Sequence, residues 1–276
     1  MKISQRNLRV SAALAGILIT ILVCEIVLSY DPLGVIYLRE VATLWSNSEE
    51  IPAGWAQKPG TYQFRNWATT ILPDNTRKVP DAPTSAPRTW VILGDSVAFG
   101  YGVDDANTFA NVMARALPNI HIINAAVSGY NSENIRRRVQ DFPDAERFIY
   151  LVINNDAEST AAFRATVRTD LTHTFLDNMW SILYLQTVPH ILTTRSQGSF
   201  VPTDVTRFES DVRALASDNR VMMVGFESDP LAQAARTWVG AEVIADVGHP
   251  VSWADGHPNA EGHQEIAAAL LALIER

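Results

Sequence analysis

Apolar residues from Thr89 to the C-terminus follow two periods that alternate along the chain. Apolar runs predict buried strands at 89–95, 120–125, 147–154, 220–226 and 241–245. Apolar positions at helical spacing predict helices at 108–117, 132–142, 207–218 and 259–276. Strands that alternate with helices indicate an α/β domain, with a mostly parallel sheet covered by helices on both faces.

Residues 31–87 show neither period. Prolines interrupt this segment, and "PDAPTSAP" at 80–87 is typical of a linker or a surface loop. Trp45, Trp55 and Trp67 indicate that part of the segment packs onto the folded body. We therefore predict three regions: a membrane anchor or signal segment at 1–30, a linker or stalk with a docking segment at 31–87, and the α/β domain at 88–276.

The N-terminal segment has the length and the flanks of a transmembrane helix. Three basic residues precede an apolar stretch, Val10–Tyr30, whose 21 residues match the roughly 20 that cross a bilayer. Glu25 lies near the far end of this stretch, where its carboxylate can reach the headgroups. Basic residues stay on the inner side, so we expect the body of the protein outside the cytoplasm.

Two other interpretations of this segment remain open. "VLS" at 27–29 is acceptable as a signal-peptide cleavage site, so the protein can instead be cleaved and secreted. Cys24 suggests a lipoprotein cysteine, although Val23 before it is larger than the small residue usual at such sites. All three interpretations export the domain to the periplasm or the cell surface.

Composition and charge exclude several classes of protein. The chain of 276 residues is 47% hydrophobic and 19% charged, as in ordinary globular proteins. Its formal charge is -8, and the part beyond residue 30 is more acidic still, because residues 1–30 carry a net positive charge. An acidic body without a basic stripe argues against a nucleic-acid partner. Cys24 is the only cysteine, so no intramolecular disulfide can form.

The residues with chemical potential follow the predicted strands, where ligands bind in parallel sheets. Ser96 comes after the first strand, behind a glycine that permits a sharp turn. A serine there is also a good helix cap. The GxSxG signature of other hydrolases is absent, because Ala98 stands at its last position, and no phosphate-binding loop is present.

The next two strands end in groups that can hold an oxyanion. Gly129, in "NAAVSGYN" at 124–131, can bring a backbone N–H close to a ligand, and Asn155 can donate from its amide. Taken alone, Gly129 is equally explained as a turn glycine, and Asn155 is better explained as a polar strand end. The segment "FLDNMWSILYLQ" at 175–186 predicts an apolar helix beside or over this site.

"DGHPNAEGH" at 255–263, before the last helix, supplies a candidate base. His257 can accept a proton, and Asp255 can hold its other ring nitrogen. Alternatively, Asp255, His257 and His263, with His249 nearby, can ligate a metal. No paired histidine or cysteine pattern supports that alternative. His263 is more simply a polar residue of the last helix.

These four stretches, in this order, resemble the SGNH hydrolase family, also called GDSL, over roughly residues 88–275. The resemblance assigns Ser96 as nucleophile, His257 as base, and the Ser96 amide, Gly129 and Asn155 as the oxyanion hole. The sequence departs from the family pattern at Ala126 and Ile153, where glycines are usual. In the last block one residue separates Asp255 from His257, whereas the family usually has two (D-x-x-H). This shorter spacing weakens the assignment of Asp255 more than that of His257.

The resemblance implies a three-layer α/β/α fold of flavodoxin-like type and a serine esterase that needs no cofactor or metal. Its substrates would be small acyl esters or acylated glycans, above all O-acetyl groups of envelope polysaccharide, or lipid acyl esters. Two alternatives remain open. An O-acetyltransferase would use the same acyl-enzyme with a sugar hydroxyl in place of water. A non-catalytic envelope protein would bind glycan through a degenerate site.

Overall fold

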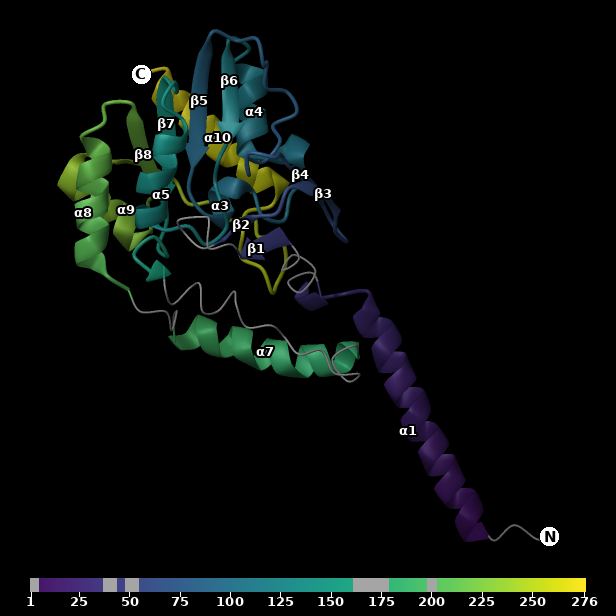
Figure 1. Ribbon diagram of the computed structural model, residues 1–276. Coiled ribbons are helices and arrows are strands. Elements are labelled where there is room, and N and C mark those ends of the chain that lie inside the picture. The colour runs from purple at the N-terminus through teal and green to yellow at the C-terminus, as the bar shows by residue number, and fades with distance from the viewer. Residues whose placement is uncertain (1–4, 37–43, 48–54, 161–178, 198–202) are drawn as a thin grey trace. The chain divides into compact units, whose positions relative to one another are not determined.

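The computed structural model describes residues 5–36, 44–47, 55–160, 179–197 and 203–276. The chain forms two compact units. The first, here the helical unit, comprises Met1–Val41, Leu171–Ser199 and Ser252–Ala254. The second, here the sheet unit, comprises Ala42–Asp170, Phe200–Val251 and Asp255–Arg276. Figure 1 shows both units, which are described separately below.

The sheet unit is built on five strands in the order β6-β5-β7-β8-β9, and all neighbouring pairs are parallel. The strands are β5 (Arg88–Leu93), β6 (Ile120–Asn124), β7 (Arg147–Val152), β8 (Val221–Phe226) and β9 (Glu242–Ile244). The order places the second strand on one side of the first and the third on the other, as in flavodoxin-like folds. The predicted α/β class is thus confirmed, and the switch of direction lies between β5 and β7.

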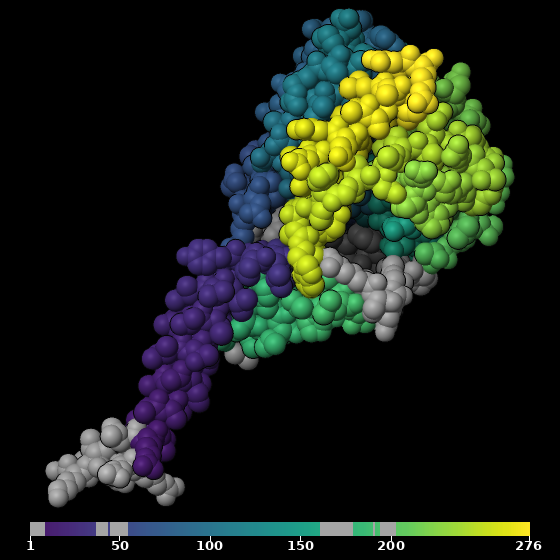
Figure 2. Space-filling view, turned by 180° about the vertical axis from the view of Figure 1, so that it is seen from behind, coloured from purple at the N-terminus to yellow at the C-terminus, as the bar shows by residue number. Residues whose placement is uncertain are grey.

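Helices cover both faces of this sheet (Figure 1). One layer consists of α4 (Phe109–Ala116) and α10 (Ala260–Ile274), which pack together; α10 runs along the face seen in Figure 2. The other consists of α5 (Ser132–Arg138), α8 (Val205–Ala216) and α9 (Pro230–Val239). Alternate residues of the strands, such as Val91 and Leu93, contribute to one buried cluster with this second layer. The sheet is therefore buried on both faces, as the apolar strands predict.

Residues between α1 and β5 also contribute to the sheet unit. They form two antiparallel pairs, β1 (Trp45–Asn47) with β2 (Trp55–Gln57) and β3 (Gly60–Gln63) with β4 (Ala68–Ile71). Trp55 and Trp67 are fully buried; the side chain of Trp45 lies outside the described part. The sheet unit therefore begins well before residue 88.

The helical unit joins α1 (Gln5–Ser29) to α7 (Trp180–Gln197). Within α1, Arg9–Ser29 is long and apolar enough to cross a membrane, and most of it is exposed (Figure 2). This fits the predicted transmembrane or signal helix. The helix expected at 175–186 begins at Trp180 and extends further than predicted; residues 175–178 lie outside the described residues.

The end of α1 is tied to the first turns of α7 by polar contacts. The Glu25 carboxylate accepts hydrogen bonds from the backbone N–H groups of Trp180, at 2.8 Å, and Ser181, at 3.1 Å, and from the Ser181 hydroxyl. The Tyr184 hydroxyl donates to Asp31 Oδ1 at 2.7 Å. The Glu25 carboxylate therefore caps the N-terminus of α7, whereas the sequence predicts only that this carboxylate reaches the headgroups.

Candidate active site

Ser96 lies at the carboxyl end of β5, on the first residue of the short helix α3 (Ser96–Phe99). Gly94 makes the turn possible, because its φ of +146° is unfavourable for other residues. A side chain there would also meet the Cβ of Ala98 at 2.6 Å and the Leu151 carbonyl at 3.1 Å. The Asp95 carboxylate caps α3 by accepting from the Val97 N–H at 2.9 Å.

His257 connects Ser96 to Asp255. The Nε2 atom of His257 lies 2.8 Å from the Ser96 hydroxyl oxygen, and its Nδ1 atom makes a short contact with Asp255 Oδ1. The same carboxylate oxygen accepts the His257 backbone N–H at 3.0 Å. Asp255 is buried at 3% exposure. Thus the one-residue spacing in "DGH" does not prevent the pairing, because a tight turn brings the carboxylate back onto both the backbone and the ring.

The surroundings of His257 favour its protonated form. Burial alone lowers the pKa of this imidazole, but the hydrogen bond to Asp255 and the charges of Asp255 and Asp95 outweigh it. The net effect is a pKa above the usual 6.5. Tyr101 packs against the ring with centroids 4.9 Å apart, which limits how the imidazole can turn. An imidazolium formed by proton transfer is therefore stabilised in place.

Asp95 links the Ser96 side chain to that of Asn155. Its Oδ2 atom accepts the Ser96 hydroxyl at 2.9 Å and the Asn155 amide Nδ2 at 3.0 Å, and the residue is fully buried. No role for Asp95 is predicted from the sequence. The residue was visible within "GDS", but nothing in one sequence indicates that its carboxylate points towards the next strand. Asp95 and His257 both contact the Ser96 hydroxyl, which has one proton to donate.

Asn155 follows β7, which places it across the switch point from Ser96. One hydrogen of its amide nitrogen is engaged by Asp95, and the amide nitrogen carries a second hydrogen. Asn154 is exposed, whereas Asp156 is buried and accepts the Ile153 N–H at 2.9 Å. The three residues after the strand therefore have different surroundings, and only Asn155 reaches the Ser96 cluster.

Gly129 lies after β6, in the left-handed conformation with a φ of +79°. The loop is tied to the serine turn by a hydrogen bond from the Val127 N–H to the Gly94 carbonyl, at 3.1 Å. The carbonyl of the preceding residue, Ser128, accepts the indole N–H of Trp55 at 3.0 Å. A trans peptide directs its C=O and N–H in opposite directions, so Trp55 orients the Gly129 N–H away from itself.

Neither the Ser96 nor the Gly129 backbone N–H has an acceptor among the described residues. Both are therefore available to a bound ligand, as oxyanion donors must be. Trp55 belongs to residues 31–87, the segment predicted from the sequence to be a linker or stalk. Only its aromatic character pointed to packing, and nothing predicted its hydrogen bond to this loop.

A cavity of about 340 Å³ adjoins the site. Its wall is shared by the loops that carry Ser96, Asn155 and His257, through their neighbours Val97, Asn154 and Gly256. The rest of the wall combines apolar and polar side chains: Ile153, Phe226, Ser228, Asp229, Pro230, Asp246, Val247 and Pro258. Ile153, which departs from the family pattern, thus contributes to this cavity.

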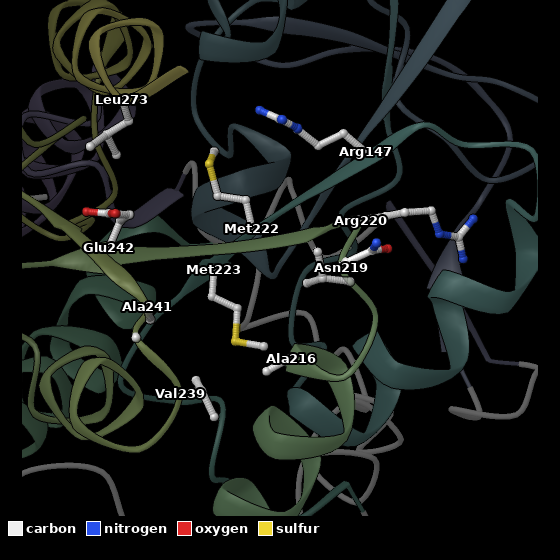
Figure 3. A pocket seen from close by; sticks show the side chains of 12 residues that line it. Arg147, Ala216, Asn219, Arg220, Met222, Met223, Val239, Ala241, Glu242 and Leu273 are labelled. Carbon is white, nitrogen blue, oxygen red and sulfur yellow. The ribbon is translucent and has the colours of Figure 1, made fainter. Parts of the chain in front are cut away.

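A second cavity, of about 320 Å³, lies at the opposite edge of the sheet (Figure 3). Arg147 and Glu242 begin β7 and β9, and Arg220 immediately precedes β8, so the cavity lies at the amino ends of these strands. Its wall contains neither the predicted site residues nor their neighbours in sequence, whereas such neighbours line the first cavity. Ligands of parallel sheets bind at the carboxyl edge, which favours the cavity beside Ser96.

The other histidine of the last block, His263, and the nearby His249 are engaged elsewhere. His263 is buried between α4 and α10, where its Nδ1 accepts the Phe109 N–H at 3.3 Å. Burial, with the charges of Arg77 and His257, lowers the pKa of His263 to about 3, so it is neutral. His249 lies 3.2 Å from both Glu261 and Glu265. Within the described residues, no group of three or more acidic, histidine or cysteine side chains is placed to hold a metal ion.

The chain is similar to a known protein family and to several solved structures. The model of the GDSL-like Lipase/Acylhydrolase family matches residues 92–265. Among solved structures, the psychrotrophic esterase EstA from Pseudoalteromonas is 12% identical, with 68% of this chain and 100% of that chain covered and a TM-score of 0.41. A family two carbohydrate esterase from Cellvibrio japonicus is 15% identical, with 73% and 64% covered and a TM-score of 0.42.

A G-D-S-L family lipolytic protein from Veillonella parvula is 14% identical, with 68% of this chain and 99% of that chain covered and a TM-score of 0.41. No curated protein matches the chain. The family model covers more than half of the sequence, including the Ser96 turn and the histidine loop. The chain therefore belongs to the GDSL-like lipase/acylhydrolase family, and it is a carboxylic ester hydrolase.

Proposed function

We propose that the protein is a serine esterase in which Ser96 is the nucleophile, His257 the general base and Asp255 the group that orients His257. The observation that carries the proposal is the alignment of these three side chains, with 2.8 Å between Ser96 Oγ and His257 Nε2 and Asp255 at the other ring nitrogen. A serine hydroxyl is a weak nucleophile until a base accepts its proton. The raised pKa of His257 supports this role.

The reaction runs in two steps. His257 takes the Ser96 proton while Ser96 Oγ bonds to the ester carbonyl carbon, and the carbonyl electrons move to its oxygen. The tetrahedral intermediate collapses, the C–O bond to the alcohol breaks, and His257 protonates the leaving alkoxide. Water then attacks the acyl-serine by the same route, which releases the acid and restores the Ser96 hydroxyl.

The oxyanion is held by three donors: the backbone N–H groups of Ser96 and Gly129 and the Asn155 amide. The two backbone groups have no acceptor within the described residues, and Asp95 keeps the Asn155 amide oriented. Donors fixed before the reaction stabilise the developing charge without reorganisation. Asp95 is thus a positioning residue, which acts through Ser96 and Asn155.

The cavity beside Ser96 supports a short acyl ester of a hydroxylated alcohol as substrate. Its volume of about 340 Å³ is at the small end of the range for ligand pockets. Asn154, Ser228, Asp229 and Asp246 supply donors and acceptors that suit hydroxyl groups, and the two carboxylates disfavour anionic substrates. With α1 as an uncleaved anchor and the sheet unit outside the cytoplasm, we propose O-acetyl esters of envelope polysaccharide as the substrate class.

Acetate release tests this function. Membranes carrying the full-length protein should release acetate from O-acetylated polysaccharide, and the Ser96→Ala variant should not. With p-nitrophenyl esters, acetate should react faster than long acyl chains. Acetyl groups that appear on a glycan acceptor, in place of free acetate, would identify a transferase; glycan binding without turnover would identify a binding protein.

A further inference from the structure

We propose that α7 is a membrane-interface helix, held by Glu25 against the outer end of α1 and embedded in the headgroup region of the bilayer. The proposal rests on the proposed role of α1 as a membrane anchor. It concerns only the helical unit and the lipid around it.

Glu25 lies inside the apolar stretch Arg9–Ser29, where an unsatisfied carboxylate would be costly. The first turn of α7 supplies the compensation, because the backbone N–H groups of Trp180 and Ser181 and the Ser181 hydroxyl donate to this carboxylate. The contact satisfies both partners, since a helix N-terminus also favours a negative charge. The two helices are therefore joined at a defined position along the candidate span.

That position fixes the depth of α7. At about 1.5 Å per residue, Glu25 lies roughly 6 Å inside the Ser29 end of α1. Interfacial helices lie about 5–10 Å deep in the boundary between headgroups and acyl chains. Two turns further along, Val188 and Pro189 still lie beside Cys24 and Leu28, around one apolar hollow of about 430 Å³. From its first turn to Pro189, α7 thus stays at the level of the last turns of α1.

Three exposed apolar residues lie about one turn apart along one side of α7. Leu185 is 72% exposed and Leu192 53% exposed, and Pro189 lies on the same exposed side. The opposite side is buried, where Tyr184 packs with Val35 and Ile36. In water the exposed leucines would be unfavourable, whereas acyl chains would cover them and enter the adjoining hollow.

Aromatic residues mark the same level. Tyr30, directly after α1, is 80% exposed, and Trp180, the first residue of α7, is partly exposed. Tyrosine and tryptophan concentrate at the membrane–water interface because their rings are apolar with one polar tip. The occupant of the exposed face of α7 is therefore the phospholipid interface around the anchor.

Fluorescence quenching in vesicles tests the proposal. In the full-length protein carrying Cys24→Ser, a bimane label is attached to Leu185→Cys or Leu192→Cys in phosphatidylcholine vesicles. We expect quenching by a lipid nitroxide near the headgroup and protection from iodide in the water. A label at Thr237→Cys, an exposed residue of α9, is the aqueous control. A label at Leu18→Cys, within α1, reports on the anchor itself.

The outcomes separate the two proposals. If Leu18→Cys is quenched from within the bilayer while Leu185→Cys and Leu192→Cys respond to iodide like Thr237→Cys, the anchor holds and the interfacial helix is refuted. If Leu18→Cys is open to iodide, the anchor fails, and α7 has no membrane to lie in.

Glu25→Leu keeps α1 apolar but removes the acceptor, so it should reduce lipid quenching at Leu185→Cys and leave Leu18→Cys unchanged. Undiminished quenching at Leu185→Cys would contradict docking through Glu25.

Discussion

The two edges of the parallel sheet carry cavities of similar volume, about 340 Å³ at the carboxyl edge and about 320 Å³ at the amino edge. At the carboxyl edge, loops after separate strands bring Ser96, Asn155 and His257 together around buried carboxylates. At the amino edge, the guanidinium groups are engaged by their surroundings: Arg220 bonds Asp218, and Arg147 lies over the ring of Trp90. Volume alone therefore does not identify a site; the direction of the strands decides which edge collects reactive groups.

The largest expected effect separates the two edges directly. Ser96→Ala and His257→Ala should each lower kcat by roughly 10⁶-fold, and the double variant should be little worse, because the two residues act as one unit. Arg147→Ala, at the amino edge, should leave kcat and KM unchanged. Steady-state kinetics on p-nitrophenyl acetate measure all four variants. A large loss from Arg147→Ala in a protein that still melts like the wild type would break the comparison.

Asp255→Asn should come next, with a loss of kcat of roughly 10⁴-fold, because an amide holds the imidazole in the wrong tautomer. The pH profile gives the sign. Since His257 must be neutral to accept a proton and its pKa is raised, wild-type kcat/KM should fall with decreasing pH from above 6.5. Asp255→Asn removes the charge that raises this pKa and leaves the burial that lowers it, so the acid limb should move to lower pH. An unmoved limb would show that another group controls it.

Asn155 and Asn154 are neighbours in sequence with different surroundings, and they sharpen the comparison within the carboxyl edge. Asn155→Ala should lower kcat by about 10²–10³-fold, as the loss of one oxyanion donor does. Asn154→Ala should change kcat little, because Asn154 lines the cavity without reaching the Ser96 cluster. The opposite ranking, measured under the same conditions, would show that Asn154 and not Asn155 is the oxyanion donor.

The smallest effect concerns the peptide that carries the Gly129 N–H. Trp55→Phe keeps a ring in the core but removes the hydrogen bond to the Ser128 carbonyl. This hydrogen bond should contribute about 1–1.5 kcal/mol to the orientation of the Gly129 N–H. Its loss should therefore lower kcat by roughly tenfold and leave KM nearly unchanged. Trp67→Phe is the matched control, since Trp67 is equally buried and its indole N–H has no acceptor among the described residues. Equal effects from both variants would reduce the role of Trp55 to packing.

The parts of the fold that the sequence predicts are those with a strong local signal. The strands around Trp90 and Phe148 are continuous apolar runs, so their burial between two layers of helices follows from the pattern of apolar residues along the chain. In contrast, β1 to β4 have only three or four residues each and depend on pairing between segments. The helix α9 is not predicted, because the residues it buries are alanines, which give only a weak apolar period. Asp229 and Pro230 are nevertheless typical of a helix N-terminus and could have indicated it.

The candidate site shows the same division. Ser96, Asn155 and His257 could be proposed because each follows a strand or precedes a helix at the expected edge. Asp95 and Trp55 could not, because their roles depend on contacts between distant segments: Asp95 with Asn155, and Trp55 with Ser128. Asp255 was uncertain from its spacing, and the turn that returns its carboxylate to His257 is visible only in three dimensions.

Site-specific labelling tests the central claim, that Ser96 activated by His257 is the nucleophile. A fluorophosphonate probe is added to the folded protein, and the labelled peptide is identified by mass spectrometry. The account predicts one modified residue, Ser96, with no labelling of Ser96→Ala and much slower labelling of His257→Ala, each variant keeping the wild-type melting temperature. Modification of a different serine, or full esterase activity in folded Ser96→Ala, would contradict it.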